Sequence, residues 1–135
     1  QYNKLVDKQI AASLKHEKLT GWDAIDAYFD ETVVKLSNKH RSMGCILVNS
    51  LCESINYNKD MKKIVRGSLA TIRKALVAKL KEAHKKAKLK KGVSVEFAAE
   101  ILMNTLHGVR VNARDGKNAK QLRDLIKFVV VSLKK

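Results

Sequence analysis

The chain contains no proline and only six glycines in 135 residues. Folds built from β-hairpins need such residues in their many tight turns, so their scarcity argues against sandwiches and barrels. Aromatic residues are also few, at 5% of the sequence, whereas apolar residues make up 45%. This composition favours an all-α fold with a core of Leu, Ile, Val and Ala, and the length fits one domain covering residues 1–135.

The sequence also lacks any apolar run near the roughly 20 residues that a membrane-spanning helix needs, and it has no signal-peptide pattern. Its two cysteines, Cys45 and Cys52, are seven residues apart. On one helix their Cα atoms would lie about 10 Å apart, too far for a disulfide. We therefore expect buried thiols, a reducing cytoplasm and no membrane partner. Because the chain begins at Gln1 rather than Met, we expect it to be a fragment or a processed product.

No motif for catalysis is present. None of the four histidines has a second His, Cys or carboxylate at a repeating ligand-like spacing. The sequence contains neither a glycine-rich phosphate loop nor a nucleophile elbow. We therefore expect no metal, no cofactor and no enzymatic activity.

Positive charge dominates, with 28 Lys and Arg against 13 Asp and Glu, a formal net charge of +15. One interpretation is a basic helical protein that binds nucleic acid directly through its lysine-rich surface. The other is a soluble protein whose lysines coat its helices. Because arginine, which favours base readout, is rare here, the composition leaves both open. The densest run, Lys79 to Lys91, lacks interleaved aromatic residues and is preferably interpreted as a solvated helix end.

Apolar residues recur at steps of three and four along most of the chain, which predicts helices. The expected helices cover residues 1–18, 22–37, 44–55, 59–88, 94–114 and 118–133. A buried strand is the alternative for Cys45 to Val48, but Leu51, Cys52 and Ile55 continue at helical spacing and favour the helix. The longest should start after Asn58, carry Ala87 on its core stripe, and stop at Gly92. Ser94 should start the next helix.

The last two expected helices each carry a second apolar or mixed face beside the first. A helix at the rim of a monomer needs only one apolar face, so the second predicts a partner surface, with Gly108 allowing close approach. The alternative is that both helices are central in the monomer. The expected dimer interface consists of Phe97, Ile101, Thr105, Gly108, Asn112, Gln121, Leu125, Phe128 and Ser132.

Bulky, soft or polar-tipped residues on the apolar faces can line a cavity for a small, partly apolar ligand. Plain core packing is the alternative for each one of them. The candidate ligand-binding residues are Tyr2, Trp22, Tyr28, Phe29, Cys45, Val48, Cys52, Ile72, Met103 and His107.

Two segments resemble the TetR/AcrR family of transcriptional regulators. Gly44 to Asn49 looks like the Gly-Cys-Leu-Leu-Val-Asn element that opens the sixth helix of that family. Ala98 to Arg114 resembles its eighth helix, with Val109 in place of the usual leucine. In order and spacing, the six expected helices match the family's fourth to ninth helices.

The resemblance implies the effector-binding and dimerisation half of a repressor. Residues 1–18 would be the helix that connects to an N-terminal helix-turn-helix module, which this chain lacks. Two copies would pair through their last two helices as a four-helix bundle. A small-molecule effector would move the connecting helix, change the spacing of the two DNA-reading heads, and so release operator DNA.

Overall fold

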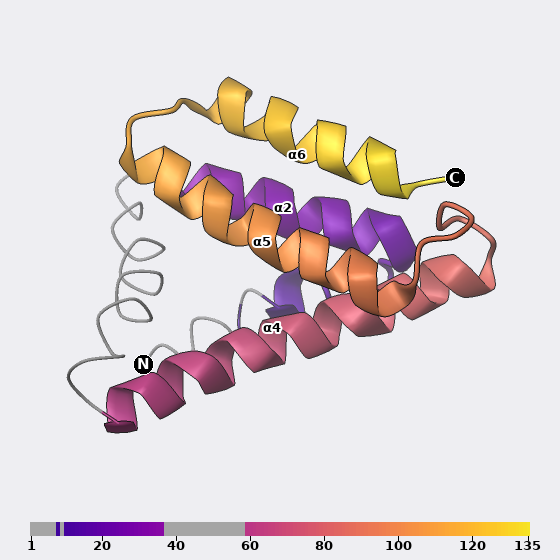
Figure 1. Ribbon diagram of the computed structural model, residues 1–135, viewed down its shortest axis with the longest axis horizontal. Helices are drawn as coiled ribbons and strands as arrows, with labels where there is room; N and C mark the ends of the chain where they lie inside the picture. The colour runs from indigo at the N-terminus through magenta and orange to yellow at the C-terminus, as the bar shows by residue number, and fades with distance from the viewer. Residues whose placement is uncertain (1–7, 9, 37–58) are drawn as a thin grey trace.

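The computed structural model describes residue 8, residues 10–36 and residues 59–135. The described part contains the helices α2 (Gly21–Leu36), α4 (Lys59–Lys85), α5 (Val95–Arg114) and α6 (Ala119–Leu133). In Figure 1, α4 runs along one side of the molecule, α5 crosses its middle, and α6 lies on the opposite side. Helix α2 contacts all three of these helices. The expectation of an all-α fold is confirmed for the described residues, whereas the helix expected over 44–55 lies outside them.

Side chains at their first turns fix where α5 and α6 begin. The Ser94 hydroxyl accepts a hydrogen bond of 3.0 Å from the backbone N–H of Phe97. At α6, Asn118 and Gln121 form a reciprocal capping box with two bonds of 2.9 Å. These bonds satisfy N–H groups that have no partner within the helix, which is why Ser94 and Asn118 start the helices, as the sequence predicted.

The end of α4 differs from the prediction. The helix stops at Lys85, and Ala87 follows with a φ of +56°, so the stop comes before Gly92. The N–H of Lys88 bonds to the carbonyl of Ala83 at 2.8 Å, which is the closing bond of a Schellman motif. Ala87 is therefore exposed rather than part of the core stripe.

The first expected helix is also shorter than predicted at its C-terminal end. Residues 10–12 are helical and residues 13–15 form a turn, so the helix does not reach Lys18. The chain bends there because Ile10 and Leu14 are both buried, while the charged residues after them face solvent.

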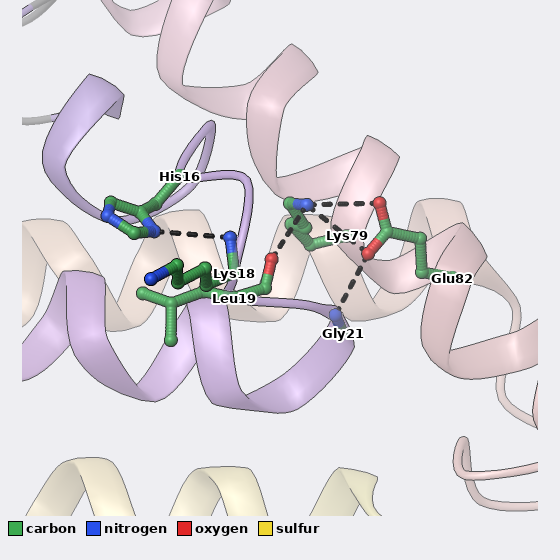
Figure 2. Close-up of polar contacts among 6 residues, drawn as sticks. All are labelled: His16, Lys18, Leu19, Gly21, Lys79 and Glu82. Atoms are coloured by element: carbon green, nitrogen blue, oxygen red, sulfur yellow. Dashed lines mark hydrogen bonds and ion pairs between the residues drawn. The ribbon is translucent and has the colours of Figure 1, made fainter.

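A polar junction ties the start of α2 to α4 (Figure 2). Gly21 adopts a φ of +51°, which favours glycine, and its N–H donates to Glu82 Oε1 at 3.0 Å. The Lys79 ammonium bonds both Glu82, at 3.0 Å, and the carbonyl of Leu19, at 3.2 Å. Desolvation raises the pKa of Glu82, but the bonds from Gly21 and Lys79 lower it by more, so the net shift is downward. The carboxylate is thus kept charged where it caps α2.

The core is aliphatic, as the composition predicted, with three aromatic side chains from α2. Tyr28 and Phe29 meet edge to face, with ring centroids 5.8 Å apart. Trp22 lies at the start of the helix, where its Nε1–H donates to the carbonyl of Lys88 at 3.0 Å. None of the described helices is long and apolar enough to cross a membrane.

Candidate functional site

A groove runs along the outer side of α5 and α6, with a volume of about 660 Å³. We call it the α5/α6 groove. Six of the nine residues predicted for the dimer interface line it: Thr105, Gly108, Asn112, Gln121, Leu125 and Phe128. Val109, Lys117, Asp124 and Val129 complete the lining. The other three predicted interface residues, Phe97, Ile101 and Ser132, do not line the groove.

Large apolar side chains of this region are open to solvent. Phe128 is 76% exposed, Phe97 59% and Leu125 45%. Val111 and Val131, on the same two helices, are also exposed. Leu125 and Phe128 both line the groove, and exposed apolar side chains gathered in this way are typical of an interaction surface.

Gly108 adds a second property to the groove. A Cβ atom placed there would meet nothing within 4 Å, so the packing of the protomer does not require a glycine. Glycine in the middle of a helix lowers stability by roughly 1 kcal/mol relative to alanine. The free space over Gly108 opens into the groove, where a second helix could approach closely.

A buried polar cluster forms the second candidate site, between α2 and α5. Tyr28 and Arg110 are only 1% and 5% exposed. Among the described residues, neither the Tyr28 hydroxyl nor His107 Nδ1 has a hydrogen-bond partner in good geometry. One turn along α2, the Thr32 hydroxyl donates to the backbone carbonyl of Tyr28, at 2.9 Å.

The electrostatics of this polar cluster are set by burial and by Arg110. Burial raises the pKa of Tyr28, and the positive charge of Arg110 only partly opposes this shift. Burial also lowers the pKa of His107, and Arg110 lowers it further, so the imidazole is neutral at pH 7. The cluster therefore presents a neutral phenol, a neutral imidazole and a cation to whatever lies beside it.

The other predicted ligand-binding residues fall into three groups. Phe29 packs on Tyr28, while Ile72 and Met103 are buried in the core. Trp22 lies at the far end of α2 with its polar atom already bonded. The remaining four, which the structure does not describe, are Tyr2, Cys45, Val48 and Cys52.

Arg110 was missing from the residues that the sequence singled out as ligand-binding. The available signal was its position one turn after His107, beside the apolar stripe of Leu106, Val109 and Ala113. An arginine is rarely buried unless its charge is paired. The described residues contain no group of three or more His, Cys, Asp or Glu side chains suited to a metal.

Comparison with known families settles the class. Residues 21–129 match the family model described as the tetracyclin repressor-like C-terminal domain. The chain belongs to the TetR family of transcriptional regulators. The match begins at the first residue of α2 and covers α4, α5 and most of α6, so it includes both candidate sites of this TetR-family domain.

Solved structures agree with this assignment at the level of the fold. The TetR-family chain is similar to a TetR transcriptional regulator from Chloroflexus aurantiacus J-10-FL, with a TM-score of 0.81 and 18% sequence identity. The alignment covers 98% of this chain and 69% of that regulator. No curated protein matches the sequence.

Proposed function

We propose that this chain is the regulatory half of a TetR-type repressor, which pairs with a second copy of itself and binds a small effector in its helical interior. Effector binding releases operator DNA through a helix-turn-helix module outside residues 1–135. The single observation that carries the proposal is the exposed apolar groove on α5 and α6, which Phe128 lines with 76% of its surface exposed.

The pairing follows from the geometry of the α5/α6 groove. A twofold dimer places the same patch of both subunits in contact, so one self-complementary groove is enough. Helices α5 and α6 from each copy then form a four-helix bundle, with Phe128 of one copy filling space beside Gly108 of the other. Burial of the exposed phenylalanines and leucine supplies the driving force.

Sedimentation equilibrium over 1–100 μM protein tests this part. We expect a dimer across most of that range. A strict monomer at 100 μM would contradict the pairing.

The buried polar cluster of Tyr28, His107 and Arg110 supports the effector half of the proposal. A buried polar atom without a partner costs roughly 1–3 kcal/mol, so a ligand that satisfies Tyr28 and His107 gains that energy. The effector is therefore a small, partly apolar molecule that carries at least one hydrogen-bonding group.

Coupling between the two sites needs a two-state element. The effector shifts the equilibrium only as far as it binds one state more tightly than the other. Residues 16–21 are the described segment best placed for this role, because Lys79 and Glu82 hold that turn against α4. A shift of α2 against α4 would be transmitted through these bonds to the segment before Thr20.

Calorimetric titration with a library of small aromatic and aliphatic acids, alcohols and amides tests the effector site. For any ligand found, Tyr28→Phe should weaken binding by about tenfold, the equivalent of one hydrogen bond. Trp22→Phe is the matched control, because it also removes one polar hydrogen but at the far end of α2. If Trp22→Phe weakens binding and Tyr28→Phe does not, the site lies elsewhere.

A further inference from the structure

Seven lysines gather at one end of the molecule, outside both candidate sites. They come from the last turn of α4, the loop after it and the end of the chain, which lie at the same end in Figure 1. We call this surface the basic end. It consists of Lys85, Lys86, Lys88, Lys90, Lys91, Lys134 and Lys135.

Backbone bonds hold the basic end together. Leu89 and Lys134 form an isolated antiparallel bridge. The N–H of Lys90 donates to the carbonyl of Leu133 at 2.8 Å, and the N–H of Lys135 donates to the carbonyl of Lys88 at 3.0 Å. Leu89 itself is 5% exposed, so it anchors the loop in the core while the lysines on both sides of it face outward.

The charge of this surface is poorly compensated. Within the described part of the chain, none of the five lysines from Lys85 to Lys91 forms an ion pair within 4.0 Å. Lys134 alone reaches a carboxylate, Asp26, at 3.4 Å. Like charges brought this close repel one another, so the arrangement favours binding of a polyanion.

A shallow groove of about 290 Å³ lies within the basic end. Four of the lysines line it, together with Trp22 and the start of α2. The Lys134 ammonium lies 5.7 Å from the centre of the Trp22 ring, which holds that side chain over the groove. The groove is therefore lined by four lysines, and Asp23 is the one acidic residue of its lining.

We propose that the basic end binds the phosphate backbone of duplex nucleic acid without reading its sequence. Lysine acts as a point charge on phosphate, whereas base readout favours arginine, which is absent from this surface. An anionic membrane is the weaker match, because membrane binding also needs exposed apolar side chains that insert into the bilayer. Trp22 and Leu89, the apolar side chains between the lysines, are buried. The inference does not depend on the proposed effector or dimer.

Fluorescence anisotropy with a labelled 20-base-pair duplex of arbitrary sequence tests this. The test variant replaces Lys85, Lys86, Lys90 and Lys91 with Gln. Each phosphate contact contributes about −0.9 to the slope of log K against log salt, so the variant should lose about 3 to 4 units of slope. Between 50 and 200 mM salt, the affinity of the unmodified chain should then fall about a hundredfold more than that of the variant.

A matched control separates this surface from net charge alone. Replacing Lys15, Lys59, Lys63 and Lys74 with Gln removes the same charge from exposed positions elsewhere. This control should keep the slope of the unmodified chain.

Equal losses in the two variants would overturn the proposal, and so would the absence of duplex binding at 50 mM salt. Tighter binding to vesicles of anionic lipid than to duplex, at equal phosphate concentration, would overturn the assignment to nucleic acid. Thermal unfolding of both variants checks that they remain folded, which we expect because all eight lysines are exposed.

Discussion

Replacement of Phe128 by glutamate is the sharpest test of the α5/α6 groove. Phe128 is 76% exposed, and a phenylalanine offers roughly 200 Å², so about 150 Å² remains to be buried by a partner. At about 25 cal/mol per Å², full burial would contribute about 4 kcal/mol per protomer. Twofold symmetry counts this residue twice, which gives an upper limit of about 8 kcal/mol for the dimer.

Half of that upper limit, about 4 kcal/mol, corresponds to a thousandfold change in the dissociation constant. Sedimentation equilibrium should therefore show Phe128→Glu as a monomer at concentrations where the unmodified chain is dimeric. Because the side chain already faces solvent, thermal unfolding of the variant measured on the monomer should change little. This last expectation distinguishes lost pairing from lost folding.

Val34→Glu is the matched control for this test. Val34 is 46% exposed on α2 and does not line the groove, so the same chemical change there should leave the dimer intact. If Phe128→Glu and Val34→Glu have the same effect, or if Phe128→Glu remains dimeric at 1 μM, the assignment of the groove as the dimer interface is wrong.

Three further predictions concern the fold and the buried polar cluster. Ala87→Gly should raise the free energy of unfolding by about 1 kcal/mol, because φ is +56° there, whereas Ala78→Gly within α4 should lower it by a similar amount. Urea unfolding measures both, and equal signs would refute the role of Ala87 in ending the helix. Glu82→Ala should lower the free energy of unfolding by about 1–2 kcal/mol, because it removes the acceptor for Gly21 and the partner of Lys79. Glu82→Gln should lower it by about half as much, and identical losses in the two variants would mean that the charge of Glu82 plays no part. The pKa of His107 is lowered below its ordinary value of 6.5, so the unfolded chain binds a proton there more readily than the folded chain does. The free energy of unfolding should therefore fall as the pH drops below about 6.5, and it should fall less in His107→Asn. Unfolding curves from pH 5 to 8 that coincide for the two proteins would contradict this.

Local chemistry explains what the sequence predicted well. Ser94 and Asn118 act on backbone groups within three residues of themselves, so the starts of α5 and α6 could be read without knowing the fold. The second face of α5 and α6 could be predicted for the same reason. Helical spacing alone places Thr105 and Gly108 on one face of α5, and Leu125 and Phe128 on one face of α6. The sequence could not show that these two faces meet in one groove, because that depends on how α5 packs against α6.

The candidate effector site was only partly predictable. Tyr28 and His107 were identified by their type, an apolar body with a polar tip on an apolar face. The burial of Arg110 could not be predicted, because a charged residue is normally solvated and its burial follows from the packing of α5 against α2. The pKa shift of His107 depends on that same burial, so the neutral imidazole could not be derived from spacing alone.

The end of α4 could not be predicted from local sequence, because long-range contacts determine where the helix stops. Gly92 is the better helix terminator by residue type, yet the helix stops at Lys85 and Ala87 takes the left-handed conformation, which costs an L-residue roughly 1 kcal/mol. The early stop brings the backbone of Lys88 to both Trp22 Nε1, at 3.0 Å, and the N–H of Lys135, at 3.0 Å. Two hydrogen bonds between partners far apart in the sequence outweigh the local strain, since each contributes roughly 0.5–1.5 kcal/mol. The same early stop turns the lysines that follow α4 out of a helix and into the loop that forms the basic end, so the strained residue and the charged surface have one structural cause.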